Sequence, residues 1–343
     1  MFNKKILNFG DVGKARSFIY GVSILLIMFY HCGLRCSTTV GSFIKSTGDI
    51  GVEIFFFLSG ISLYFSFTKD RNVPAFYARR MKRILPSYLI VYTAVFVFLD
   101  FVQSCNPRQF FLDITLLDFW LHGLGRAPWF VAAIIVFYAL YPLLYDLTFV
   151  ENKKRGLTVA FYTSIAIVMA LLFIFCDQLR LFTVRIPIFI TGCLFGKVVY
   201  DNEDLKAYFF LIITVLSAGS AVSFFLLKEF WWVKNVFYYF FGIFLVIVLT
   251  AAHKLISRFV PIVAIPFDFL GGITFEIYLC HEKIQEFLML LLNHMGFQVE
   301  FQNFYYQITC IVSAIIIAFC VNKLGRLLLV PFRDKVAKTD KTK

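Results

Sequence analysis

The sequence predicts an all-α, polytopic transmembrane helical bundle of about ten spans, and three observations lead to that fold class. Hydrophobic residues make up 60% of the 343 residues, whereas charged residues make up only 16%. Apolar runs of roughly 20 residues, enough to cross about 30 Å of hydrocarbon, recur along almost the whole chain. These runs are continuous and lack the alternation of a transmembrane β-barrel, so we expect each one to be a helix.

The apolar runs define the expected spans in order. They cover residues 17–35, 50–68, 85–104, 127–147, 157–175, 183–200, 207–227, 235–252, 264–292 and 304–330. No small-residue cleavage site follows the first run, so we expect a retained signal anchor. No soluble linker separates the runs, and we expect one integral-membrane domain over residues 1–343.

Lysine and arginine predict the orientation, because cytoplasmic loops keep an excess of positive charge. The segments between alternate spans are basic, as are residues 1–16 and 332–343, while segment 201–206 is the weakest of this set. Both termini are therefore expected on the cytoplasmic side of a bacterial plasma membrane. The net charge of +12 is spread over short loops and forms no continuous basic face, so we expect no nucleic-acid partner.

Ionisable residues inside a span cost on the order of 3 kcal/mol on insertion scales, so each marks a candidate site. His31 lies roughly 20 Å along the first, outward-running span at about 1.5 Å per residue. His281 lies about 25 Å along the ninth span, beside Glu282. Glu53 falls in the first turn of the second span, and Arg185 opens the sixth. These five residues share one depth in the outer part of the membrane.

A histidine beside a carboxylate suits proton abstraction from a hydroxyl, because the carboxylate orients the imidazole and stabilises the imidazolium. The cluster therefore favours acyl transfer to a sugar. The alternative for His31 alone is a structural hydrogen bond between helices, and for Glu53 a capping or pairing role. Glu276, which falls in the middle of a span, is expected to pair within the bundle.

A second polar concentration precedes the third span, where the sequence reads FYARRMKRILP from Phe76 to Pro86. Its arginines, Arg79, Arg80 and Arg83, supply more positive charge than is needed to orient the span in the membrane. Beside an aromatic pair they suit the phosphates and adenine of coenzyme A. The alternative is a polybasic segment that meets anionic membrane lipid.

A metal site is not expected. His31, Cys32 and Cys36 are spaced around a helix in a way that suits tetrahedral zinc poorly. A Walker A loop and a dinucleotide fingerprint are both absent from the sequence, so ATP hydrolysis and hydride transfer have no visible carrier.

Six stretches in this order resemble the acyltransferase-3 family of bacterial integral-membrane O-acyltransferases over nearly the whole chain. They are ILLIMFYH ending at His31, GVEIFFFLSG from Gly51, FYARRMKRILPSY from Phe76, PWFVAAIIVFYALYP from Pro128, RIPIFITGCLFG from Arg185 and FLGGITFEIYLCHE from Phe269.

The resemblance implies that acetyl-coenzyme A is held from the cytoplasmic side and that its acetyl group passes to an extracytoplasmic sugar hydroxyl. It makes His31 the main catalytic histidine, as general base, and Glu53 the residue that orients it. Further site positions match, in the basic donor-binding segment and beyond it: Arg79, Arg80, Arg83, Arg185 and His281. The acceptor implied is a surface polysaccharide or a lipid-linked glycan.

The chain departs from the family pattern at three points. Tyr20 stands where an arginine or lysine is frequent, with Arg16 one turn earlier, and Ile134 and Ile135 stand where many members carry a glutamate. No esterase domain is expected after the membrane domain, as in the shorter branch of the family. The alternative functions are a transporter of a glycan or lipid-linked sugar, and a structural partner in a synthase complex.

Overall fold

The computed structural model describes residues 5–125, 128–150, 155–227 and 230–329. Within them nine helices are long and apolar enough to cross a membrane, and the broken pair Pro261–Gly272 and Thr274–His294 brings the total to ten if it counts as one span. The predicted all-α, polytopic fold is therefore confirmed. The expected cytoplasmic tail, 332–343, lies outside the described residues.

The chain divides into two compact units, and the first holds the described parts of Met1–Tyr30, Cys36–Arg71 and Ala133–Gly272. Its elements are β1 Lys5–Asn8, α1 Gly10–His31 as far as Tyr30, α2 Thr39–Ser46, α3 Ile50–Lys69, α7 Trp129–Phe149 from Ala133 on, α8 Arg155–Phe175, a 3₁₀ turn Asp177–Leu179, α9 Arg180–Thr183, α10 Ile186–Tyr200, β2 Asp204–Lys206, α11 Ala207–Leu226, α12 Trp231–Phe259, a 3₁₀ turn Pro261–Val263 and α13 Ala264–Gly272.

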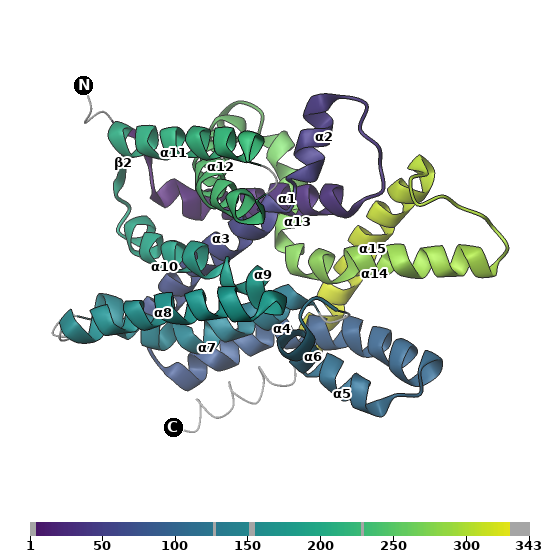
Figure 1. Cartoon of the computed structure of the whole chain (residues 1–343). Coiled ribbons are helices and arrows are strands. Elements are labelled where there is room, and N and C mark those ends of the chain that lie inside the picture. The colour runs from purple at the N-terminus through teal and green to yellow at the C-terminus, as the bar shows by residue number, and fades with distance from the viewer. Residues whose placement is uncertain (1–4, 126–127, 151–154, 228–229, 330–343) are drawn as a thin grey trace. The chain divides into compact units, whose positions relative to one another are not determined.

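The second unit holds His31–Arg35 and the described parts of Asn72–Ala132 and Ile273–Lys343. Its elements are α4 Val73–Phe96, a π-helix Val97–Gln103, α5 Pro107–Ile114, α6 Leu117–His122, α14 Thr274–His294 and α15 Phe304–Leu328. Helices α14 and α15 run side by side (Figure 1). The buried hydroxyl of Tyr306 on α15 joins them by donating to the backbone carbonyl of Gln285 at 2.5 Å.

Glycine lets α3 and α10 of the first unit pack with their backbones in contact. A Cβ on Gly192 would lie 2.2 Å from the carbonyl oxygen of Phe57, and one on Gly60 would lie 2.6 Å from the backbone nitrogen of Cys193. Close helix approach through small residues is the usual way in which spans associate where the solvent is lipid. The contact holds Glu53 of α3 in a crowded interior.

Helix α8, in contrast, presents an exposed apolar surface that suits the hydrocarbon of a bilayer. None of its residues is buried, and large apolar side chains such as Leu157, Val159 and Ile174 are more than half exposed. An apolar helix exposed on this scale is unfavourable in water and ordinary in a bilayer. The membrane is therefore the solvent of the described helices.

Several boundaries differ from the expected spans. Helix α1 begins at Gly10, inside the predicted N-terminal segment 1–16, and ends at His31. Helix α4 begins at Val73, well before residue 85, because Asn72 caps it. Its first half is basic, so its mean hydropathy is too low to be recognised as part of a span. The expected span 264–292 is interrupted at Ile273, directly after Gly271 and Gly272, which are poor helix formers.

Candidate active site

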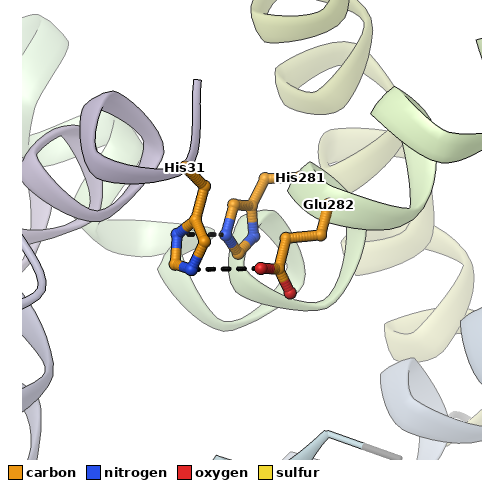
Figure 2. A group of neighbouring side chains, drawn as sticks. All are labelled: His31, His281 and Glu282. Carbon is orange, nitrogen blue, oxygen red and sulfur yellow. Dashed lines mark hydrogen bonds and ion pairs between the residues drawn. The ribbon is translucent and has the colours of Figure 1, made fainter. Parts of the chain in front are cut away.

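Three side chains that the sequence placed at one depth meet in the second unit (Figure 2). His31 is the last residue of α1, and its ring lies across from that of His281 with centroids 5.0 Å apart. His31 Nε2 lies 3.0 Å from Glu282 Oε1, and His31 Nδ1 lies 3.3 Å from His281 Nε2. The imidazole of His31 therefore bridges a carboxylate and a second imidazole.

Helix α14 presents both partners of His31 from consecutive positions. Successive residues of a helix point about 100° apart, so one side chain faces inward and the next faces outward. His281 is 2% exposed, and its Nδ1 donates to the carbonyl of Tyr278 at 2.8 Å. Glu282 is 50% exposed, and His31 is 30% exposed. The site is thus anchored by a buried ring and open on the side of the carboxylate.

The arrangement has the parts of a general base. In the tautomer that directs the Nε2 proton of His31 at Glu282 Oε1, 3.0 Å away, Nδ1 is the basic nitrogen of the neutral ring. The same carboxylate would stabilise the imidazolium formed when that nitrogen takes a proton. A nitrogen from each ring and an oxygen of Glu282 also lie within 4.8 Å of one another, so these three residues are able to hold a metal ion.

Glu53 and Arg185 form a buried ion pair in the first unit. Glu53 lies in the first turn of α3, Arg185 precedes α10, and Arg185 Nη1 lies 2.7 Å from Glu53 Oε1. They are 1% and 3% exposed, and Arg185 Nη1 also donates to Asn235 Oδ1 at 2.9 Å. One carboxylate oxygen of Glu53 and the Nε of Arg185 have no hydrogen-bond partner among the described residues. Each buried group thus retains one unused polar atom.

The polar cluster around Arg185 contains residues that sequence reasoning did not single out. Asn235 is one, and the hydroxyl of Tyr238 donates to Asp49, whose other oxygen lies 3.4 Å from Lys234 Nζ. The signal was the start of α12 at Trp231, which carries Lys234, Asn235 and Tyr238 on its first two turns. The expected start at residue 235 left Lys234 outside the span, and the position of Asn235 and Tyr238 around the helix had no sequence signal.

The basic segment forms the first half of α4 in the second unit. Arg79 and Arg83 are exposed one turn apart, and Arg80 is partly buried with its guanidinium 5.4 Å from the ring centre of Phe76. The arginines and the aromatic ring of Phe76 therefore lie close together on one helix.

The prediction for Glu276 is confirmed. Glu276 is 1% exposed on α14, and Ser87 of α4 donates its hydroxyl to Glu276 Oε1 at 2.8 Å. This contact explains the carboxylate as a link between two helices of the second unit and sets it apart from the cluster around His31.

Comparison with known proteins agrees with the motifs. The model of a family described as an acyltransferase domain matches residues 19–323, nearly the whole chain. No curated protein and no solved structure matches the sequence. The matched segment includes both histidines, the buried ion pair and the basic helix. The chain therefore belongs to the acyltransferase-3 family and is a multi-pass membrane acyltransferase.

Proposed function

We propose that this protein moves an acetyl group from acetyl-coenzyme A, bound from the cytoplasmic side of a bacterial plasma membrane, to a hydroxyl of an extracytoplasmic glycan. The observation that carries the proposal is the contact series Glu282–His31–His281, with separations of 3.0 and 3.3 Å. It supplies a positioned base, and the partial exposure of His31 and Glu282 leaves the pair accessible to an alcohol.

His31 acts as the general base in this reaction. Its basic nitrogen takes the proton of the sugar hydroxyl as the hydroxyl oxygen bonds to the thioester carbonyl carbon. The carbon–sulfur bond then breaks, coenzyme A leaves as the thiolate, and the proton held by His31 returns to the sulfur. Glu282 stabilises the transient imidazolium, and in that state Nδ1–H of His31 donates to His281 Nε2, 3.3 Å away.

The donor is held by the positive groups. The exposed guanidinium groups of Arg79 and Arg83, with Arg80, bind the phosphates of coenzyme A, because planar guanidinium groups pair well with phosphate oxygens. We propose a donor contact for Arg185 of the first unit as well, since its buried Nε–H has no partner among the described residues. Glu53 holds Arg185 in position through the 2.7 Å ion pair.

The acceptor is a surface polysaccharide or a lipid-linked glycan. A sugar hydroxyl is the group whose proton a histidine base removes at neutral pH, and the partly exposed His31 and Glu282 leave the pair accessible. The reaction as written needs no metal ion and no redox cofactor.

Label transfer tests the proposal. Membranes that contain the native chain or His31→Ala, at matched protein levels, receive radiolabelled acetyl-coenzyme A and the native surface glycan. The expected result is labelled glycan with the native protein only. No transfer by either protein, together with movement of the intact glycan across the membrane by the native chain, would overturn the proposal in favour of transport.

A further inference from the structure

The contact between the two histidines has an unusual hydrogen-bond balance. His281 Nδ1 lies 2.8 Å from the backbone carbonyl of Tyr278. A carbonyl oxygen only accepts, so this nitrogen carries the proton, and Nε2 of the neutral ring carries a lone pair. The lone pair is directed toward His31.

The ring of His31, when neutral, also directs a lone pair toward the other histidine. Its Nε2 lies 3.0 Å from Glu282 Oε1, and an ionised carboxylate also only accepts. The proton of the neutral His31 ring is therefore on Nε2, and Nδ1 carries the lone pair. Two lone pairs then face each other across the 3.3 Å between His31 Nδ1 and His281 Nε2. A cation in the gap makes the contact favourable: either a proton that turns one ring into an imidazolium and joins the two nitrogens by a hydrogen bond, or a metal ion that takes both lone pairs.

The dimensions of the gap fit a metal ion. A tetrahedral zinc ion with zinc–nitrogen bonds of about 2.0 Å holds two nitrogen ligands about 3.3 Å apart. One nitrogen of each histidine and one oxygen of Glu282 lie within 4.8 Å of one another, so a side-chain movement of Glu282 supplies a third ligand. The carbonyl of Tyr278 orients the ring of His281, as outer hydrogen bonds do for metal-bound histidines.

We propose that His31, His281 and Glu282 form a binding site for one Zn²⁺ ion, with the fourth position left to water. Imidazole nitrogen suits zinc and other late transition metals better than Mg²⁺ or Ca²⁺. The exposure of His31 and Glu282, 30% and 50%, gives the ion a route from solvent. Because the ion takes the lone pair that accepts the substrate proton, it inhibits acyl transfer reversibly. Only the inhibition rests on the proposed function.

Direct metal binding tests the site without any reference to activity. The purified full-length protein, without a histidine tag, is cleared of metal with a chelator and titrated with Zn²⁺, and with Co²⁺ for its visible spectrum. We expect one ion per chain and a Co²⁺ spectrum typical of four ligands. His281→Ala and Glu282→Gln should each weaken binding by at least tenfold, since even outer-sphere partners of a metal matter by that much.

The matched control is His122→Ala. His122 Nδ1 also pairs with a carboxylate, Asp118 at 2.7 Å, but lies outside the group of three. Its loss should leave the binding of zinc unchanged. Glu282 is half exposed, so Glu282→Gln keeps the test valid if the buried His281→Ala variant misfolds, as a melting curve would show. No bound ion, or full affinity in Glu282→Gln, would overturn the site.

Inhibition is tested in the same preparation by label transfer. Zn²⁺ should abolish transfer by the native protein at the concentration that fills the site, and a chelator should restore it. Filling of the site without inhibition would overturn the inhibitory role. If the native protein shows no transfer at all, the proposed function fails while the count of bound ions still decides the metal site.

Discussion

At the scale of single residues, the carboxylate of Glu282 is the group that makes His31 a base. It lies 3.0 Å from Nε2 and is itself half exposed, so its charge is partly screened by solvent. A hydrogen bond to a charged group contributes about 1.5–3 kcal/mol, which corresponds to roughly 10–100-fold in rate when it acts on the transition state. Replacing the charged carboxylate of Glu282 by a neutral amide should therefore slow the proton transfer without altering the fold.

Glu282→Gln is expected to lower kcat by about 10–100-fold and to leave KM for acetyl-coenzyme A unchanged. Initial rates of label transfer measure both. Glu286→Gln is the matched control on the same helix, because Glu286 is exposed and pairs with Lys283 at 3.0 Å, away from the group of three. Equal rates in the two variants would contradict the role of Glu282.

The buried pair of Glu53 and Arg185 has consequences for stability. Glu53→Gln leaves the guanidinium without its countercharge in the interior, which costs about 3–5 kcal/mol when one partner is removed. Unfolding of the purified protein by detergent or heat measures the loss. Asp11→Asn breaks two solvent-accessible ion pairs, with Lys254 at 2.7 Å and with Lys14 at 3.2 Å, and should cost about 0–1 kcal/mol for each. Equal losses would contradict the buried pair's importance.

Depth along a helix was predictable at this scale, and direction around it was not. The rise per residue placed His31, His281 and Glu282 at one level, and they do meet. The rise does not say which face of a helix turns toward which neighbour, since packing decides that. The partners of the two carboxylates, His31 for Glu282 and Arg185 for Glu53, therefore had to come from the structure.

At the scale of elements, close packing of α3 against α10 holds Glu53 and Arg185 in register. Gly192→Leu should destabilise the protein by at least about 1–3 kcal/mol, because its Cβ would lie 2.2 Å from the carbonyl oxygen of Phe57. Unfolding measurements check this result. Gly219→Ala on α11 is the control, since no atom lies within 4 Å of the added Cβ and helix propensity favours alanine. A tolerated Gly192→Leu would contradict the contact.

Substitutions in helix α4 distinguish a coenzyme A site from a general contact with anionic lipid. Arg79→Ala with Arg83→Ala should raise KM for acetyl-coenzyme A at least tenfold with kcat nearly unchanged, because guanidinium groups lost from phosphate binding weaken the donor complex. Lys82→Ala removes a positive charge from the same exposed segment and is the control for charge alone. If KM rose by the same factor for each positive charge removed, whichever residue carried it, anionic lipid would be favoured as the partner.

The start of α4 shows why this element was only partly predictable. Hydropathy identifies the length of helix that lies in hydrocarbon, and the basic stretch from Arg79 to Arg83 lowers the average below that of a span. The helix nevertheless continues back to Val73, because Asn72 accepts the backbone N–H of Ala75 at 2.9 Å and caps it. A capping residue was the signal to look for.

At the scale of the whole molecule, the fold class followed from composition because a bilayer leaves few choices. Every backbone group in hydrocarbon needs a partner within its own segment, so long apolar runs become helices. The same argument does not predict how helices group, which depends on side-chain contacts. The division of the described chain into two compact units was accordingly not predicted.

The central claim is that His31 is the base of an acyl transfer, and release of coenzyme A in single-turnover conditions tests it most directly. Native protein, His31→Gln and His122→Ala, in the presence of acetyl-coenzyme A and glycan, are compared for the rate at which free thiol appears. We expect His31→Gln to lose about 10²–10⁴-fold in this rate and His122→Ala to match the native protein. Thiol release by His31→Gln at the native rate would contradict the account.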